Sequence, residues 1–227
     1  MLVHDLRGPL GNLISAIELT SLLIENEAEI SKITHFLEMG RRSGQAISDM
    51  VDSMLDVSRL EQGEMPLQRT PTDLYELLQA VEDQVTHRAI AKQMELKIHE
   101  PPAEVNGIWL DSSMIRRVLV NLVGNAIKYT PDRGHVSLTT SISKGSQLHF
   151  AVSDDGPGIS KSDQAHIFQK FSRIDHTSST PGVGLGLAFC KLATEAHRGT
   201  ISVDSEGIPD QGTTFHVYLP IVEEATP

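Results

Sequence analysis

The sequence predicts a helical hairpin followed by an α/β domain. Residues 1–26 and 31–61 each carry apolar residues at the three- and four-residue spacing of one helix face. From residue 72 onward, stretches with helical spacing alternate with short apolar stretches typical of strands. This alternation indicates an α+β or α/β architecture for the second part. The 227 residues suffice for one or two domains with a sizeable core.

The two N-terminal helices have narrow apolar faces. Such a hairpin buries little surface alone, so we expect residues 1–62 to pair with a second copy as a homodimeric four-helix bundle. The alternative is a monomeric hairpin packed against the second domain. In the first helix the apolar face consists of Leu6, Leu10, Leu13, Ile17 and Ile24.

Glycine and proline mark the border between the two parts. Gly63, Pro66 and Pro71 interrupt the helical pattern, as is typical of a domain boundary. We therefore expect domains at 1–65 and 66–227. Within the second domain the pattern predicts helices at 72–92, 111–129 and 182–196, a short helix after 160, and strands at 96–99, 136–142, 147–153, 200–203 and 213–219.

Composition narrows the range of partners. The net charge of −11 at pH 7 argues against nucleic acid or an anionic membrane surface. Cys190 is the one cysteine, which excludes an internal disulfide framework. No apolar run reaches the ~18 residues that span a bilayer, and the start has no leader pattern. We expect a cytoplasmic location, no membrane contact and, because so little precedes His4, a longer natural protein.

The pair His4-Asp5 suits nucleophilic chemistry. The carboxylate can accept a hydrogen bond from one ring nitrogen and leave the lone pair of the other free to attack. Pro9, five residues after His4, should loosen the helix nearby. The alternative is an ordinary surface pair of histidine and aspartate.

Asn121, Asn125 and Lys128 fall on one face of a predicted helix, because they are spaced four and three residues apart. Amide oxygens together with a cation can hold a hydrated Mg²⁺ and the phosphates that it bridges. The alternative is a polar strip on a solvated helix.

Asp154 ends a predicted strand, and Gly156, Gly158 and Ile159 follow it. Glycines at a strand end let the backbone approach a flat ligand closely. The Asp154 carboxylate could then accept a hydrogen bond from an exocyclic amine such as adenine N6. The alternative is a plain tight turn.

Gly182, Gly184 and Gly186 open the helix predicted at 182–196. Amides at a helix N-terminus favour phosphate, although this spacing matches neither the dinucleotide fingerprint nor the Walker motif. The segment 172–181, rich in serine, threonine and charge, is interpreted as a mobile lid over the nucleotide.

In this order and spacing the stretches resemble the sensor histidine kinases of bacterial two-component systems, over nearly the whole chain. Residues 4–10 are similar to the phosphoacceptor H-box, and residues 121–131 to the N-box. The other similar stretches are the close of the second dimerisation helix at 53–63, the first glycine box at 154–159, the F-box at 168–171, the second glycine box at 182–187 and the last strand motif at 212–215.

The resemblance implies a dimerisation and phosphotransfer domain joined to a Bergerat-fold (GHKL-type) α/β sandwich that binds ATP. It also implies that ATP phosphorylates His4, with Asp5 fixing its tautomer, and that the phosphoryl group passes to an aspartate in the receiver domain of a response regulator. By position, Asn125 would bind Mg²⁺ with help from Asn121. The other implied nucleotide contacts are Lys128, Tyr129, Asp154, Gly156, Gly158, Ile159, Arg173, Gly182, Gly184, Leu185, Gly186, Leu187 and Thr213.

Two positions depart from the family pattern. Gly8 stands where a threonine or asparagine usually helps to position water, so we expect poor phosphatase activity toward the partner. Asp210 stands where a glycine usually precedes Gln211, for which we expect only a small backbone change.

Three alternative functions remain open. One is an ATPase of the same superfamily, although such enzymes carry a glutamate base where Asn121 stands. The second is a dimeric nucleotide-binding scaffold without histidine phosphorylation. A serine or threonine kinase of related fold is the third, and such kinases have no H-box.

Overall fold

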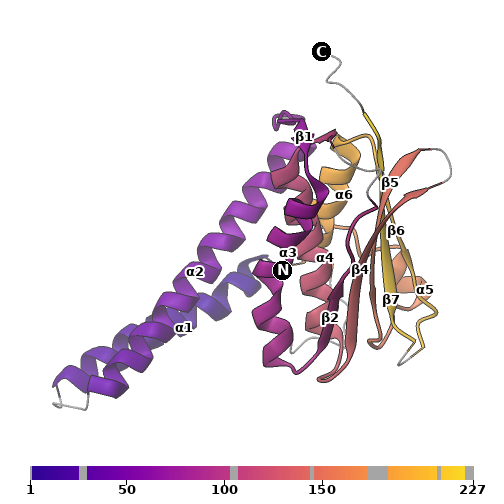
Figure 1. The fold of residues 1–227 in the computed structure, drawn as a ribbon. Coiled ribbons are helices and arrows are strands. Elements are labelled where there is room, and N and C mark those ends of the chain that lie inside the picture. The colour runs from indigo at the N-terminus through magenta and orange to yellow at the C-terminus, as the bar shows by residue number, and fades with distance from the viewer. Residues whose placement is uncertain are drawn as a thin grey trace.

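The computed structural model describes residues 2–25, 30–102, 107–143, 146–172, 184–208 and 211–222, with side chains omitted for 2–5 and 25. Two long helices reach away from an α/β body, to which the second helix is joined at one end (Figure 1). No helix in the described segments is long and apolar enough to cross a bilayer.

The predicted hairpin is confirmed. Helices α1 (Leu2–Glu25) and α2 (Ile30–Glu61) pack along each other, and α1 continues as a helix through Pro9. The closest approach is at Gly40, where an added Cβ would lie 3.3 Å from the Cβ of Ala16. Ala16 is buried there, whereas Leu10 and Ile17 on the expected apolar face are 48% and 59% exposed.

The body is built on a five-stranded sheet with the order β2-β4-β5-β7-β6. Strand β2 runs parallel to β4, and the other neighbours are antiparallel. Residues alternate between a buried and a more exposed face, as the β7 pattern shows. The strands are β2 (Glu95–Ile98), β4 (His135–Ser143), β5 (Gln147–Asp154), β6 (Thr200–Asp204) and β7 (Thr213–Pro220).

Three helices cover one face of this sheet (Figure 1). Aspartates begin two of them, because the side chains of Asp73 and Asp111 accept hydrogen bonds from first-turn amides. The core lies between helices and sheet and includes Ile115, Leu119 and Phe150, all fully buried. The helices are α3 (Leu74–Ala91), α4 (Ser112–Tyr129) and α6 (Gly186–Ala196), and the short α5 (Lys161–Gln164) stands apart from them.

A second, two-stranded sheet was absent from the prediction. Strands β1 (Thr70–Thr72) and β3 (Ile108–Leu110) pair antiparallel, with Pro71 opposite Trp109. Each strand has three residues, too few to show an alternating pattern. Pro71, the central residue of β1, also indicated an interruption of regular structure. Proline is tolerated because β1 is an edge strand.

The end of α2 packs onto the body instead of standing free. Val57 is 2% exposed within the core of the body, and Lys170 Nζ lies 2.6 Å from Glu61 Oε2. The hairpin and the body are therefore in direct contact close to the predicted boundary.

Candidate functional site

A pocket of about 390 Å³ lies between α4 and the start of α6. It brings together two stretches that are far apart in sequence, Asn121–Tyr129 and Gly184–Leu187. Eight of the predicted site residues line it: Asn121, Asn125, Lys128, Tyr129, Gly184, Leu185, Gly186 and Leu187.

On the α4 side, helix spacing places the two asparagines and Lys128 on the face that lines the pocket. The Lys128 ammonium donates a hydrogen bond to the Tyr129 hydroxyl at 3.1 Å and lies 4.7 Å from the centre of the Tyr129 ring. This side therefore offers amide oxygens, a cation and an aromatic ring.

On the α6 side, the chain approaches α4 through glycines. An added Cβ at Gly186 would lie 3.3 Å from the Asn121 amide oxygen. Gly184 has φ +69°, and a Cβ there would lie 2.7 Å from the Ser172 carbonyl oxygen, so only glycine fits. The first turn of α6 has no side-chain cap at Leu185. Its free amides and the helix dipole therefore favour an anion such as phosphate.

Asp154 forms a second part of the site. It is the last residue of β5 and, by strand alternation, shares the helix-facing side with the buried residues Phe150 and Val152. Its carboxylate accepts a hydrogen bond from the Gly156 amide at 2.9 Å. Burial raises the pKa of Asp154 to about 6. The lining described for the α4–α6 pocket does not include Asp154.

Thr130 connects the two parts. It directly follows Tyr129 and is fully buried, and its Oγ1 has no hydrogen-bond partner in the described part of the chain. A Cβ at Gly156 would lie 3.3 Å from that Oγ1 and 2.8 Å from Asp154 Oδ1. The Thr130 hydroxyl is therefore buried beneath the loop that carries the half-buried Asp154 carboxylate.

Ser205 holds the Asp154 loop in place, and sequence reasoning missed it. Its hydroxyl accepts from the Ile159 amide at 2.9 Å and donates to the Gly212 carbonyl at 2.7 Å. Gly158, with φ +76°, passes so close that a Cβ would lie 3.1 Å from the hydroxyl. Thr213, which follows Gly212, donates its amide to Asp154. A lone serine after a strand carries no sequence signal for this role.

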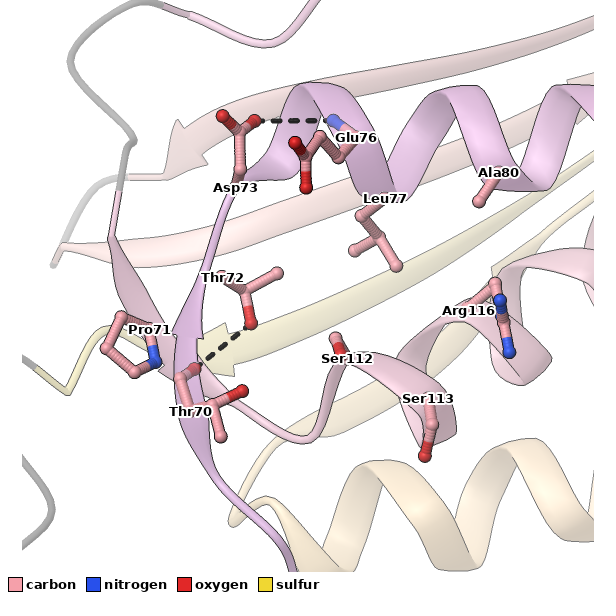
Figure 2. A pocket seen from close by; sticks show the side chains of 10 residues that line it. All are labelled: Thr70, Pro71, Thr72, Asp73, Glu76, Leu77, Ala80, Ser112, Ser113 and Arg116. Carbon is pink, nitrogen blue, oxygen red and sulfur yellow. Dashed lines mark hydrogen bonds between the residues drawn. The ribbon is translucent and has the colours of Figure 1, made fainter.

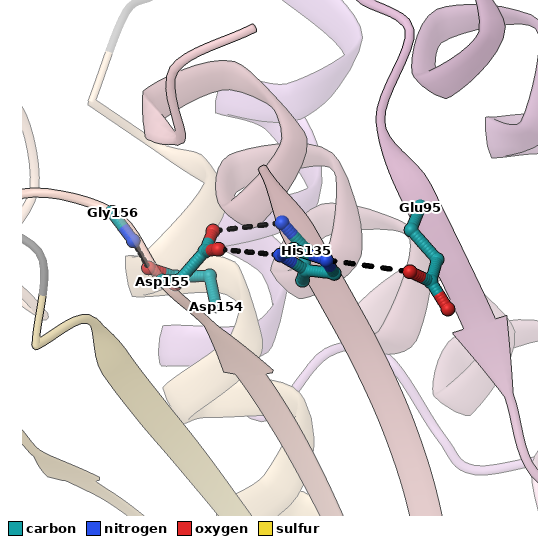
Figure 3. Close-up of polar contacts among 5 residues, drawn as sticks. All are labelled: Glu95, His135, Asp154, Asp155 and Gly156. Atoms are coloured by element: carbon teal, nitrogen blue, oxygen red, sulfur yellow. Dashed lines mark hydrogen bonds and ion pairs between the residues drawn. The ribbon is translucent and has the colours of Figure 1, made fainter. Parts of the chain in front are cut away.

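The neighbouring Asp155 turns toward the sheet edge (Figure 3). It accepts hydrogen bonds from the backbone amide and the Nδ1 of His135, both at 2.8 Å. Glu95 Oε2 lies 3.3 Å from His135 Nε2. The hydrogen bond and charge of Asp155, followed by the charge of Glu95, raise the pKa of His135. These contacts fasten the loop to β4.

A different pocket, of about 270 Å³, lies beside the first turns of α3 and α4 (Figure 2). Asp73 there caps α3, and the Thr72 hydroxyl donates to the Thr70 carbonyl at 3.0 Å. The described lining of this pocket contains none of the predicted site residues.

Several predicted site residues lie outside the described positions. His4 and Asp5 belong to α1, but their side chains are outside the description, as are Arg173 and Gly182. The expected lid at 172–181 is described only at Ser172, which lines the α4–α6 pocket. The expected backbone change at Asp210 also falls outside it.

Four lining residues come from elements that the sequence did not connect with the site. Asp49, Met50 and Ser53 reach the pocket from α2, and Arg88 reaches it from α3. These contacts depend on how the helices pack together, and the sequence pattern of α2 and α3 does not connect them with the pocket.

Comparison with known proteins agrees with this geometry. Residues 110–223 match the family model described as histidine kinase-, DNA gyrase B- and HSP90-like ATPase. Residues 1–63 match the His Kinase A (phospho-acceptor) domain. The chain belongs to the histidine kinase family. This confirms the predicted family and fold class, a helical phosphoacceptor domain followed by an α/β sandwich of the GHKL type.

Curated relatives include the adaptive-response sensory kinase SasA of Synechococcus sp. strain JA-3-3Ab, which is 32% identical over 221 residues. The SasA of Crocosphaera subtropica is 32% identical over 225 residues. Each match covers 97% of this chain and 58% of the relative, so this histidine kinase chain spans somewhat more than half of their length.

Solved structures share the fold. Full-length ShkA in complex with AMPPNP is 29% identical, with a TM-score of 0.73, over 100% of this chain and 46% of ShkA. The Acinetobacter baumannii histidine kinase AdeS is 20% identical, with a TM-score of 0.70, over 96% of this chain and 98% of AdeS.

Proposed function

We propose that this chain is an ATP-dependent protein-histidine kinase that phosphorylates His4 and then passes the phosphoryl group to a response regulator. The main support is the α4–α6 pocket, where amide oxygens and a lysine face an uncapped helix N-terminus. Such a pocket is suited to a magnesium-bound polyphosphate. The same chain carries the phosphoacceptor domain at residues 1–63.

The Asp154 region supports adenine as the base. The ionised carboxylate would accept a hydrogen bond from the exocyclic N6. The base would lie against the backbone around Asp154, which is formed by Gly156, Gly158, Ile159 and Thr213. AMPPNP, which the ShkA complex contains, is an analogue of ATP.

The donor set fits Mg²⁺. Asn125 and Asn121 present hard amide oxygens on one helix face, and Mg²⁺ takes such oxygens while keeping several waters. We assign Asn125 as the direct ligand and Asn121 as its helper. When bound, Mg²⁺ would neutralise part of the phosphate charge. Lys128, Arg173 and the backbone amides of the second glycine box would stabilise the rest.

His4 would act as the neutral imidazole, the majority form of an unperturbed histidine at pH 7. Its Nε2 would attack the γ-phosphorus, and the bond from that phosphorus to the bridging oxygen would break, releasing ADP. Asp5 would hold the proton on Nδ1 and stabilise the developing positive charge. An aspartate of a receiver domain would then take the phosphoryl group from Nε2.

We also propose that residues 1–62 form a homodimer. Leu10, Ile17 and Ile24 on α1 and Leu37 on α2 are 48–60% exposed in the single chain. A second hairpin would bury them in a four-helix bundle. We propose domain limits of 1–65 and 66–227 and a cytoplasmic location, where ATP is present.

Gly8 has no side chain that could position water for dephosphorylation, so we propose that phosphatase activity toward the response regulator is weak.

Incubation with γ-labelled ATP tests the proposal. The expected label is stable in base and labile in acid, as a phosphoramidate is, and disappears in His4→Gln. Label that survives in His4→Gln contradicts it. Steady ATP hydrolysis without protein labelling would instead favour an ATPase of the same superfamily.

A further inference from the structure

We infer that Arg88 is a further phosphate-binding residue of the nucleotide site, and that Gly124 is the residue that admits it. The inference rests on the proposed nucleotide site and adds a contact from a helix outside the recognised motifs. Arg88 lies on α3 and lines the α4–α6 pocket together with Asn125 and Lys128.

Helix packing explains how Arg88 reaches the pocket. Lys92, which ends α3, donates to the carbonyls of Ile127 and Lys128 at 2.9 and 3.2 Å. This contact sets α3 against the end of α4. Arg88 is one turn before Lys92, and Gly124 is one turn before Lys128, so the two residues lie side by side.

Gly124 provides the space that the arginine occupies. An added Cβ at this position would lie 3.3 Å from a terminal guanidinium nitrogen of Arg88, so the guanidinium would have to move by a few tenths of an ångström. Glycine inside a helix is less favourable than alanine. The guanidinium of Arg88 therefore lies against α4 at Gly124, the residue before the proposed Mg²⁺ ligand Asn125.

The charge of Arg88 is available for a ligand. No hydrogen bond or ion pair joins its side chain to another residue in the part of the chain that the structure describes. The residue is exposed, so its charge remains hydrated until a ligand enters. A guanidinium can donate to two phosphate oxygens at once, which makes arginine well suited to bind this group.

Asp49 of α2 is the carboxylate that lines the same pocket. Its Oδ1 already accepts a hydrogen bond from the Gln45 amide at 2.9 Å. With Arg88 and Lys128, the described lining therefore carries two cations and one carboxylate, a balance that favours an anionic ligand.

Calorimetry on the full chain with Mg²⁺ and three ligands tests the inference. In Arg88→Gln we expect the affinity for ATP to fall about tenfold and that for ADP to fall less. Binding of adenosine should stay unchanged, because adenosine carries no phosphate. Arg88→Lys should recover part of the loss. Arg116→Gln is the matched control, since Arg116 is an exposed arginine that lines the other pocket, and it should bind all three ligands normally.

Gly124→Ala provides an independent variant that does not weaken the fold. Alanine favours the helix, so the melting temperature should hold or rise, while the displaced arginine lowers ATP affinity about threefold. An ATP affinity unchanged in Arg88→Gln, while Asn125→Ala still lowers it, would overturn the role of Arg88 and leave the proposed function intact. An equal loss for all three ligands would also overturn it, because Arg88 would then only shape the pocket. Failure of the unaltered chain to bind any nucleotide would overturn both proposals.

Discussion

Arg117 of α4 forms an ion pair with Asp56 of α2, which ties the hairpin to the body. The two side chains are 35% and 19% exposed, so water only partly screens their attraction. The Arg117 guanidinium also lies 4.0 Å from the centre of the Phe189 ring on α6. The pair thus holds α2 where Asp49 and Ser53 reach the nucleotide pocket.

Asp56→Asn should loosen this contact. The change leaves the partly buried Arg117 without its charged partner, which costs about 1–3 kcal/mol of the free energy of unfolding. Urea denaturation measures that loss, and hydrogen exchange should rise in residues 50–61. Arg41→Gln is the control, because Arg41 pairs with Glu38 on the solvent side of α2 and should change neither measurement. Unaltered exchange in Asp56→Asn would show that the pair does not hold the domains together.

Asp154 predicts a pH dependence of nucleotide binding. Burial raises its pKa to about 6, and the ionised carboxylate accepts a hydrogen bond from adenine N6 more strongly than the protonated carboxyl does. Affinity for ADP should therefore be full near pH 7.5 and fall by about tenfold near pH 5. Calorimetry at the two values checks this. Asp154→Asn should bind weakly at both, and equal ADP affinity of the unaltered chain at both would contradict the assignment.

His197 predicts a loss of stability in acid. Its Nδ1 donates to the Ala193 carbonyl at 2.8 Å, and its Nε2 accepts from the Asp111 amide at 3.2 Å, which requires a neutral ring. Burial is the main cause that lowers its pKa. In the unfolded chain the His197 ring has a pKa of about 6.5, so on acidification it is protonated before the ring in the folded chain. The free energy of unfolding therefore falls as the pH drops below about 6.5.

The measurement is the free energy of unfolding between about pH 7.5 and about pH 5. His197→Gln should be less stable than the unaltered chain at the upper value, and the difference should shrink toward the lower one. His87→Gln, at an exposed position of α3, should run parallel to the unaltered chain. A difference for His197→Gln that stays constant with pH would refute the neutral, buried ring.

Gly212 and Gly63 allow the cost of a positive φ to be measured separately from the cost of a steric clash when a side chain is added. Both have φ near +70°, but a Cβ at Gly212 would collide with the Asp154 carbonyl, whereas one at Gly63 meets nothing within 4 Å. Gly63→Ala should cost about 1 kcal/mol in unfolding free energy. Gly212→Ala should cost at least about twice that and should also weaken ADP binding, since the Asp154 loop must move. Equal costs, with ADP binding intact, would show that the loop is not tightly packed.

The pocket-lining motifs could be predicted because their chemistry is local. Asn121, Asn125 and Lys128 share a helix face through spacing alone. The glycines at the start of α6 were also recognisable in the sequence, because few other residues tolerate the positive φ that Gly184 adopts. The helices predicted at 72–92 and 111–129 are also confirmed, and Asp73 and Asp111 cap their first turns.

Contacts between distant segments could not be predicted in this way. Arg88, Ser53 and Ser205 contribute to the site only after helices and loops have packed. The apolar periodicity around Arg88 and Ser53 predicted their helices, but it did not indicate a contact with the nucleotide site. The small sheet of β1 and β3 was missed because its pairing joins residues about 38 positions apart across two three-residue strands.

The central claim is that ATP bound in the α4–α6 pocket transfers its γ-phosphoryl group to His4. After incubation with ATP and Mg²⁺, mass spectrometry at neutral pH should find one phosphoryl group on the peptide that contains His4. Asn125→Ala, which removes the proposed Mg²⁺ ligand, should lower its amount by at least about 100-fold. Phosphate on another residue, or undiminished phosphorylation in Asn125→Ala, would contradict the account.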